Sequence, residues 1–293
     1  MLPEPPVNVC HFFQLLSRDV WSRIAFARAM NLKISETTIT ENLLYNFYNY
    51  FEHYAVPVRL YESKEERRNG SDLEVLVETE HGYILLACQA KITYKTGNYA
   101  ALHHEVGGLR QIDLLMDYAK LHGGIAHYLF YNCPPDFMLP ATISEHETIE
   151  DNGITHLEAQ ELIEWMVTAK GTRKRPPTPS YTTFHPAMAE PFHELICQLL
   201  SRKHASKTIL PATIRQDITY YNENQVSSEA NWRKVTSLAT VGFVQESIVY
   251  NGTDENSDLQ PTTKEPEPKY YRPKFRLVIG GANSDGGGIM GIS

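Results

Sequence analysis

The sequence has no apolar run that approaches the roughly 20 residues of a membrane-spanning helix, so it predicts no membrane segment. Its first residues lack the basic and apolar parts of a secretory signal, and its four cysteines include no Cys-x-x-Cys pair. Basic residues are outnumbered, with 27 Lys and Arg against 35 Asp and Glu. These absences predict a cytoplasmic protein with reduced thiols. They argue against a surface that is positively charged throughout, but they are compatible with a local basic groove.

What the sequence does contain is ordinary globular composition, with 42% hydrophobic and 21% charged residues over 293 positions. That length suits about two domains, or one domain with large additions. We predict four parts: an N-terminal helical segment at 1–34, an α/β domain at 35–169, a basic linker at 170–180, and an accessory region at 181–293 with a disordered Gly-rich tail.

Hydrophobic periodicity predicts the helices and strands. Helices are expected at about 9–30, 39–54, 109–121, 159–169 and 190–201, and strands at about 58–61, 72–78, 83–91, 125–131, 154–157 and 275–279. The stretch Thr38-Ile39-Thr40-Glu41 fits a capping box at the start of the second helix. This order is typical of an α/β fold with a mixed sheet and helices on both faces.

Polar residues stand at the ends of two neighbouring strands. Asp72 opens one strand, and Gln89-Ala90-Lys91 closes the next, apolar strand. Residues i and i+2 of a strand point to the same face, so Gln89 and Lys91 project together, and a hairpin brings Asp72 near their shared end. Mg²⁺ prefers oxygen ligands, so Asp72 and the Gln89 amide are the expected ligands, with Lys91 beside a scissile phosphate.

The pattern Gly70-Ser71-Asp72, 16 intervening residues and Gln89-Ala90-Lys91 resembles the PD-(D/E)xK nuclease superfamily. The similar variant has Gln in place of the second acid, as in Mrr-like restriction enzymes. The segment also resembles a bacterial domain family with a Gly-x-Asp…Gln-Ala-Lys pattern and no assigned activity. The resemblance implies a restriction-endonuclease-like core, which is a mixed central sheet flanked by helices. To this core the hydrophobic patterns add an N-terminal helix and a C-terminal α+β extension.

The resemblance also implies a function: a metal-dependent endonuclease that hydrolyses phosphodiester bonds of double-stranded DNA, with Mg²⁺ or Mn²⁺ as cofactor, in restriction or anti-phage defence. It implies Glu41 as a third metal-linked acid, and Gln111 and Tyr118 as helix residues that brace the site or touch DNA. Arg67 and Arg68, just before Asp72, are expected to hold the DNA backbone. A homodimer or a defence-system partner protein is left open.

Simpler roles stay open for several of these residues. Glu41 also fits the capping box, and Glu74 is either a further ligand or the solvated partner on its strand. Lys91 is alternatively a strand-end lysine that reaches to solvent, and Gln111 an exposed helix residue. For the whole chain, two alternatives remain: a non-catalytic module on the same fold that binds nucleic acid or a partner, and an unrelated α/β interaction protein.

Overall fold

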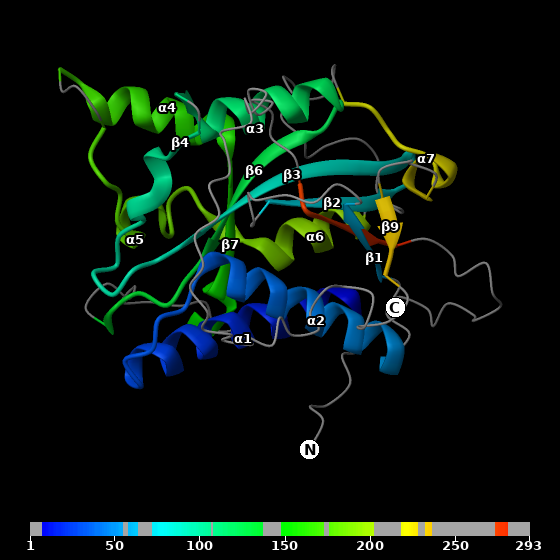
Figure 1. Ribbon diagram of the computed structural model, residues 1–293, viewed down its shortest axis with the longest axis horizontal. Helices are drawn as coiled ribbons and strands as arrows, with labels where there is room; N and C mark the ends of the chain where they lie inside the picture. The colour runs from blue at the N-terminus through cyan, green and yellow to red at the C-terminus, as the bar shows by residue number, and fades with distance from the viewer. Residues whose placement is uncertain are drawn as a thin grey trace, which may run out of the picture.

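The structure is a computed structural model that describes residues 8–54, 58–63, 72–106, 108–136, 148–172, 176–201, 218–227, 232–235 and 273–280 (Figure 1). The helical elements are α1 (Val9–Ala29), α2 (Glu36–Tyr54), η1 (Ala100–His103), α3 (Gln111–Leu121), η3 (Ile149–Gly153), α4 (Ala159–Lys170), α5 (Tyr181–Phe184), α6 (Phe192–Ser201) and α7 (Glu223–Ser227). The strands are β1 (Val58–Ser63), β2 (Asp72–Thr79), β3 (Gly82–Ile92), β4 (Glu105–Val106), β5 (Leu109–Arg110), β6 (Ile125–Tyr131), β7 (Ile154–Glu158), β8 (Glu190–Pro191), β9 (Trp232–Lys234) and β10 (Phe275–Ile279).

One mixed sheet organises the protein. Within the described residues it has eight strands, in the order β8-β7-β6-β3-β2-β10-β1-β9. β2 and β3 form an antiparallel hairpin, whereas β3 and β6 are parallel and are joined through α3. A parallel pair needs such a crossover connection, because its strands run in the same direction. β10 is parallel to β2 and antiparallel to β1.

Helices cover both faces of the sheet, with α1, α2 and α6 on one face and α3 and α4 on the other (Figure 1). The side chains of β3 alternate between these two faces. Even-numbered positions from Ile84 to Ile92 belong to the core under α1, α2 and α6, and Leu85 and Ala87 belong to the core under α3 and α4. Burial on both faces explains why this strand is an unbroken apolar run. By the same alternation, Gln89 and Lys91 fall on the α3 face.

The expected α/β class, a mixed sheet with helices on both faces, is confirmed. The start of the second helix was predicted wrongly. α2 begins at Glu36 because Ser35 caps it, and the Ser35 hydroxyl accepts a hydrogen bond from the Thr38 backbone nitrogen at 3.1 Å. No described helix combines the length and the apolar character that a membrane span requires. The predicted Gly-rich tail lies outside the described residues.

Strands from the predicted accessory region belong to the same sheet as the α/β domain. β10 lies between β1 and β2, β9 pairs with β1 at one edge, and β8 pairs with β7 at the other. All five residues of β10 are buried. The predicted boundary at 170–180 stays a prediction, but the described parts of 181–293 share one sheet and core with 35–169.

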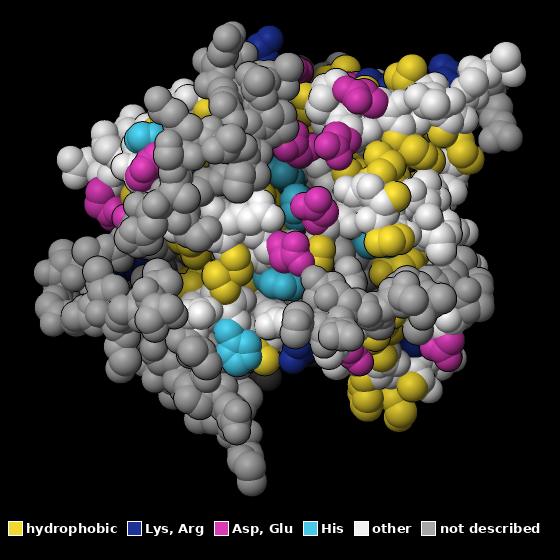
Figure 2. All heavy atoms as spheres, turned by 180° about the vertical axis from the view of Figure 1, so that it is seen from behind, with side chains coloured by type: hydrophobic (Ala, Val, Ile, Leu, Met, Phe, Trp, Pro, Cys, Tyr) yellow, Lys and Arg dark blue, Asp and Glu magenta, His cyan; other side chains and the backbone are white. Residues whose placement is uncertain are grey.

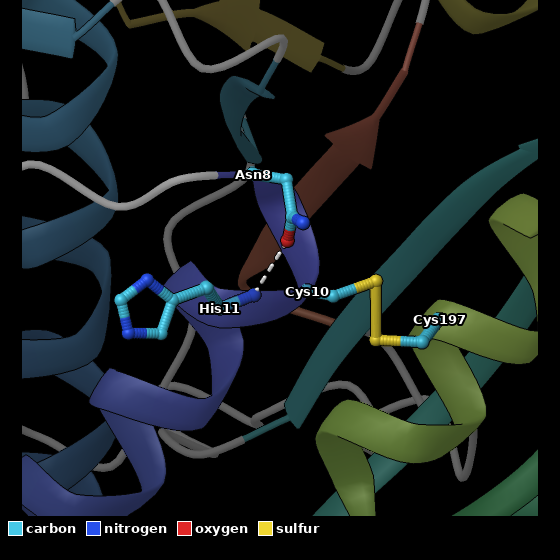
Figure 3. The surroundings of a disulfide bond; sticks show 4 residues. All are labelled: Asn8, Cys10, His11 and Cys197. Atoms are coloured by element: carbon cyan, nitrogen blue, oxygen red, sulfur yellow. Dashed lines mark hydrogen bonds between the residues drawn. A yellow bond between two sulfur atoms is a disulfide. The ribbon is translucent and has the colours of Figure 1, made fainter. Parts of the chain in front are cut away.

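A disulfide joins Cys10, in the first turn of α1, to Cys197 in α6, with a Cα–Cα distance of 5.3 Å (Figure 3). The two cysteines are 187 residues apart and meet because α1 and α6 pack together. This pair corrects the expectation of four reduced thiols, whereas Cys88 and Cys133 are buried thiols. Spacing alone does not reveal such connectivity. Disulfides are rare in the reducing cytosol, so the pair counts against the predicted cytoplasmic setting.

Reduction of this disulfide should destabilise the fold, because the cross-link restricts the unfolded chain. A reductant, or the substitution Cys10→Ser, should lower the free energy of unfolding by roughly 2–4 kcal/mol in a urea titration. Cys133→Ala is the control, and a reductant should shift it as much as it shifts the parent. Protein that is unfolded without reductant and still reacts at all four cysteines with a thiol reagent would contradict the disulfide.

Candidate active site

The hairpin of β2 and β3 sets the geometry of the candidate site. Its register makes Asp72 the Cα partner of Gln89, and Thr79 the partner of Gly82 beside the turn. Gly82 has a φ of +125°, and a Cβ there would lie 2.6 Å from the Tyr221 carbonyl oxygen. Glycine therefore suits this turn both in conformation and in space. A slip of one residue in the register would separate Asp72 from Gln89 and exchange the faces of the strand.

Lys91 is buried, and its amine is held by α3. Lys91 Nζ donates a hydrogen bond to Gln111 Oε1 at 2.8 Å, and the residue is 4% exposed. Gln111 opens α3, whose buried residues Ile112 and Leu115 pack on the same side of the sheet. A buried ammonium group requires acceptors or opposite charge, so this bond helps fix the amine. The structure brings these two predicted site residues together, and Lys91 does not reach into solvent.

Gln89 is fully buried on the same face as Lys91. Its Nε2 lies 3.5 Å from the Ala90 carbonyl oxygen, and its Oε1 has no hydrogen-bond partner among the residues that the structure describes. An unsatisfied buried acceptor costs roughly 1–3 kcal/mol, and native proteins contain few of them. A hard cation or a donor group on a ligand would satisfy this oxygen.

Glu74, two residues after Asp72, is held by the C-terminal strand. It is 0% exposed, its Oε2 accepts a hydrogen bond from Arg276 Nε at 2.6 Å, and its Oε1 accepts one from the Tyr118 hydroxyl. The Arg276 guanidinium carbon lies 4.5 Å from the centre of the Trp232 ring. Glu74 is therefore not the solvated residue that the sequence leaves open, and a cation at Glu74 would share its oxygens with Arg276 and Tyr118.

The structure does not bring Glu41 to this cluster. Glu41 lies on α2, which covers the face opposite to α3, and its Oε1 lies 3.4 Å from Lys274 Nζ. It also lies beyond the first turn of α2, so it does not cap that helix. Arg67 and Arg68 lie outside the described residues, as does the side chain of Asp72.

The donor set left for a metal is Asp72 and the Gln89 amide oxygen. Mg²⁺ is typically bound through one or two carboxylates, while water and substrate oxygens complete its shell. An acid paired across a hairpin with a buried amide whose oxygen has no described partner fits that pattern. Within the described side chains, no three histidine, cysteine, aspartate or glutamate residues are grouped to hold a metal ion.

Arg276 is the residue that sequence reasoning missed. The signal was present, because Arg276 interrupts the otherwise apolar strand Phe275–Ile279, and a charge in a buried strand needs an opposite charge. The sequence does not reveal which acid supplies it, since Glu74 lies 202 residues away. The pair becomes visible only when β10 is placed beside β2.

A second group of buried ionisable residues lies around β6 and β7. His127 is the Cα partner of Glu158, and the His127 and His156 ring centroids are 5.3 Å apart. His156 is 9% exposed, and neither ring nitrogen has a hydrogen-bond partner within the described part of the chain. Burial lowers the pKa of His156 to about 4, and burial with the nearby charge of Glu161 raises the pKa of Glu158 to about 7. Figure 2 shows histidine and acidic side chains gathered near the middle of one face of the protein.

Fold and site together define a mixed α/β protein with a buried polar cluster on one face of its sheet. Over residues 9–273 the chain matches the model of a family described as "Family of unknown function (DUF6615)", and it belongs to that family. No curated protein and no solved structure gives a significant match.

Loss of the Arg276 charge should destabilise the fold strongly, because it leaves Glu74 buried without its cation. Arg276→Met should lower the free energy of unfolding by roughly 3–5 kcal/mol in urea. Adding Glu74→Gln to that variant should restore part of the loss, since the uncompensated charge is then removed. Lys274→Met, which breaks a half-exposed pair on the same segment, should cost less than about 1 kcal/mol. Equal losses for Arg276→Met and Lys274→Met would contradict this account.

Acid should weaken the fold through His156. Its folded-state pKa of about 4 lies below the ordinary value of 6.5, so the unfolded chain takes up the proton first as the pH falls. The stability is fully present above about pH 6.5 and is lost as the pH falls toward about 4. The loss of Tm between about pH 8 and about pH 5 should therefore be smaller in His156→Leu than in the parent.

The comparison isolates His156 because Glu158, which acts in the opposite direction between its ordinary pKa of 4.5 and about 7, is present in both proteins. His81→Leu, at an exposed histidine, is the control and should follow the parent. An identical pH dependence of Tm in the parent and in His156→Leu would show that His156 plays no such role.

Proposed function

We propose that this protein is a metal-dependent endonuclease that hydrolyses phosphodiester bonds of DNA. One observation carries the proposal: the β2–β3 register pairs Asp72 with Gln89, while Gln111 holds the Lys91 amine on the same face. Double-stranded DNA as the substrate, restriction or anti-phage defence as the setting, and a homodimer or defence-system partner rest on the resemblance to PD-(D/E)xK nucleases.

The topology supports the finer assignment to a restriction-endonuclease-like core. From α2 the chain runs through β1, β2, β3, α3 and β6, which agrees with the family order of helix, three strands, helix and strand once η1 and the separate two-stranded sheet of β4 and β5 are set aside. One departure is β10, a strand from outside this segment that lies between β1 and β2. Because β10 lies on the side of β2 away from β3, it leaves the hairpin with Asp72 and Gln89 intact.

Each residue of the site has a separate role in the proposed hydrolysis of a phosphodiester. Bound Mg²⁺ would polarise the phosphate and lower the pKa of a bound water. Asp72 and Gln89 place two oxygens for the cation, and the Lys91 ammonium stabilises the negative charge that builds on the phosphate during attack. Gln111 keeps the Lys91 amine in position, so little reorganisation is needed when that charge develops.

Burial of the same residues favours a second candidate, a non-catalytic module on this fold that binds nucleic acid or a partner. Gln89 is 0% exposed and Lys91 is 4% exposed, so a phosphodiester reaches them only if the groups over them move. Gln89 is also neutral where the second acid stands in other PD-(D/E)xK members, which weakens the attraction for a cation. The two candidates differ in whether the protein cleaves its ligand.

Cleavage of plasmid DNA in the presence of Mg²⁺ or Mn²⁺ tests the first candidate. Lys91→Ala and Asp72→Asn should each lower the cleavage rate at least about 100-fold, because each removes a group that acts on the transition state. EDTA should abolish cleavage. Lys120→Ala removes an exposed lysine from α3 and should cleave at the parental rate.

Two results would argue against the nuclease. If Lys91→Ala and Asp72→Asn cleave as fast as the parent, the site is assigned wrongly. If no form cleaves DNA or RNA, while the parent binds either one, the binding module is the better account.

A further inference from the structure

A cavity of about 310 Å³ lies between α3, α4 and the segment around η1. Its floor is apolar and is formed by Leu102, Ile112 and Met166, which are 2%, 2% and 5% exposed. α3 and α4 cover the same face of the sheet as the candidate active site (Figure 1). The volume lies at the lower end of the range for small-molecule sites, so it suits one compact ligand.

Cationic side chains stand around this floor. Arg110 and Lys170 line the cavity together with one acid, Glu105. Arg110 donates to both Asp113 oxygens, at 2.7 and 2.6 Å, which holds its guanidinium in place at the start of α3. Lys170 is the last residue of α4, and no ion pair involves it within the described residues. Asp113 already balances the Arg110 charge, so Lys170 is the cation that most favours an anionic group on the ligand.

The lining side chains also favour an aromatic ring over an aliphatic chain. A methionine sulfur, here of Met166, makes favourable contacts with aromatic rings. His103 adds a second planar or polarisable group, with its Nε2 at 3.3 Å from the Pro177 carbonyl oxygen. A ligand that combines a planar ring with an anionic group therefore matches both the apolar floor and the charged residues around it.

The cavity adjoins the candidate active site through the first turn of α3. Arg110 and Ile112 line the cavity, and Gln111 between them holds the Lys91 amine. A strand that presents a phosphate to Lys91 would therefore pass close to this opening. Single-stranded nucleic acid is commonly bound by a cationic surface for its phosphates together with planar groups for its bases.

We infer that the cavity binds one unpaired nucleotide unit of a DNA strand, at a single-stranded end or flipped out of the duplex, with the base against Leu102, Ile112 and Met166 and the phosphate beside Arg110 and Lys170. The inference rests on the proposed function, and it names the part of the substrate that the region next to the active site receives. It would also anchor a strand at the entrance to a site whose own residues are buried.

Calorimetry with the full-length protein in EDTA tests the cavity without metal or cleavage. Thymidine monophosphate should bind, and thymidine and inorganic phosphate should each bind at least about tenfold more weakly, because each lacks one half of the recognised group. Lys170→Glu and Arg110→Gln should weaken binding of the monophosphate about tenfold or more. Lys120→Glu, on α3 but outside the cavity, is the charge-matched control and should bind as the parent does.

Three results would overturn the inference. These are equal binding of thymidine monophosphate to the parent and to Lys170→Glu, binding of thymidine as tight as that of its monophosphate, and no binding of any of the three compounds at millimolar concentration. A short single-stranded oligonucleotide gives a further arm: if Lys170→Glu weakens the monophosphate but leaves oligonucleotide binding unchanged, the natural ligand is a free nucleotide and not a strand.

Experiment can reject the proposed nucleotide site and the proposed nuclease activity independently of each other. Lys91 does not line the cavity, so Lys91→Ala should bind thymidine monophosphate as the parent does. Lys91-dependent cleavage without nucleotide binding would reject the cavity and leave the nuclease standing. Nucleotide binding that depends on Lys170, without cleavage by any form, would reject the nuclease and leave the cavity as a binding site.

Discussion

The antiparallel pairing of β2 with β3 is the constraint on which the rest of the candidate site depends. It joins two short polar signals, Asp72 and Gln89-Ala90-Lys91, that are separated by 16 intervening residues in the sequence. On its other side β2 is paired with β10, which brings Arg276 to Glu74. One strand therefore lies between a hairpin that forms the site and a C-terminal strand that neutralises the neighbouring acid.

Three polar residues on the α3 face occupy positions where a buried sheet favours apolar side chains. Glu74 is compensated by Arg276 and Tyr118, and the Lys91 amine is hydrogen-bonded to Gln111. The Gln89 oxygen differs, since the described residues offer it no partner. Departures from local rules that lack a compensating contact are expected at functional sites more than in purely structural cores. Other buried atoms, such as the His156 ring nitrogens, also lack a described partner, but within the candidate site the Gln89 oxygen is the atom that a structural role leaves unexplained.

Local patterns in the sequence were enough to predict most helices and strands and the shared face of Gln89 and Lys91, because periodicities of 3.6 and 2 are properties of single elements. Long-range relations were not predictable in the same way. The insertion of β10 and the Cys10–Cys197 disulfide depend on segments that are about 200 residues apart. The prediction that Glu41 joins the site was wrong for a related reason. Its helix was predicted, but which face of the sheet that helix covers depends on how the whole chain packs.

The central claim is that Asp72 and Gln89 share one divalent cation, and Mn²⁺ tests it most directly because its anomalous scattering locates the ion in a crystal. Crystals of the parent soaked in Mn²⁺ should show one strong peak within about 2–2.5 Å of an Asp72 carboxylate oxygen and of Gln89 Oε1. Crystals of Asp72→Asn should lose that peak. A parent structure at saturating Mn²⁺ with no peak between these two residues, or with the ion bound elsewhere only, would contradict the account.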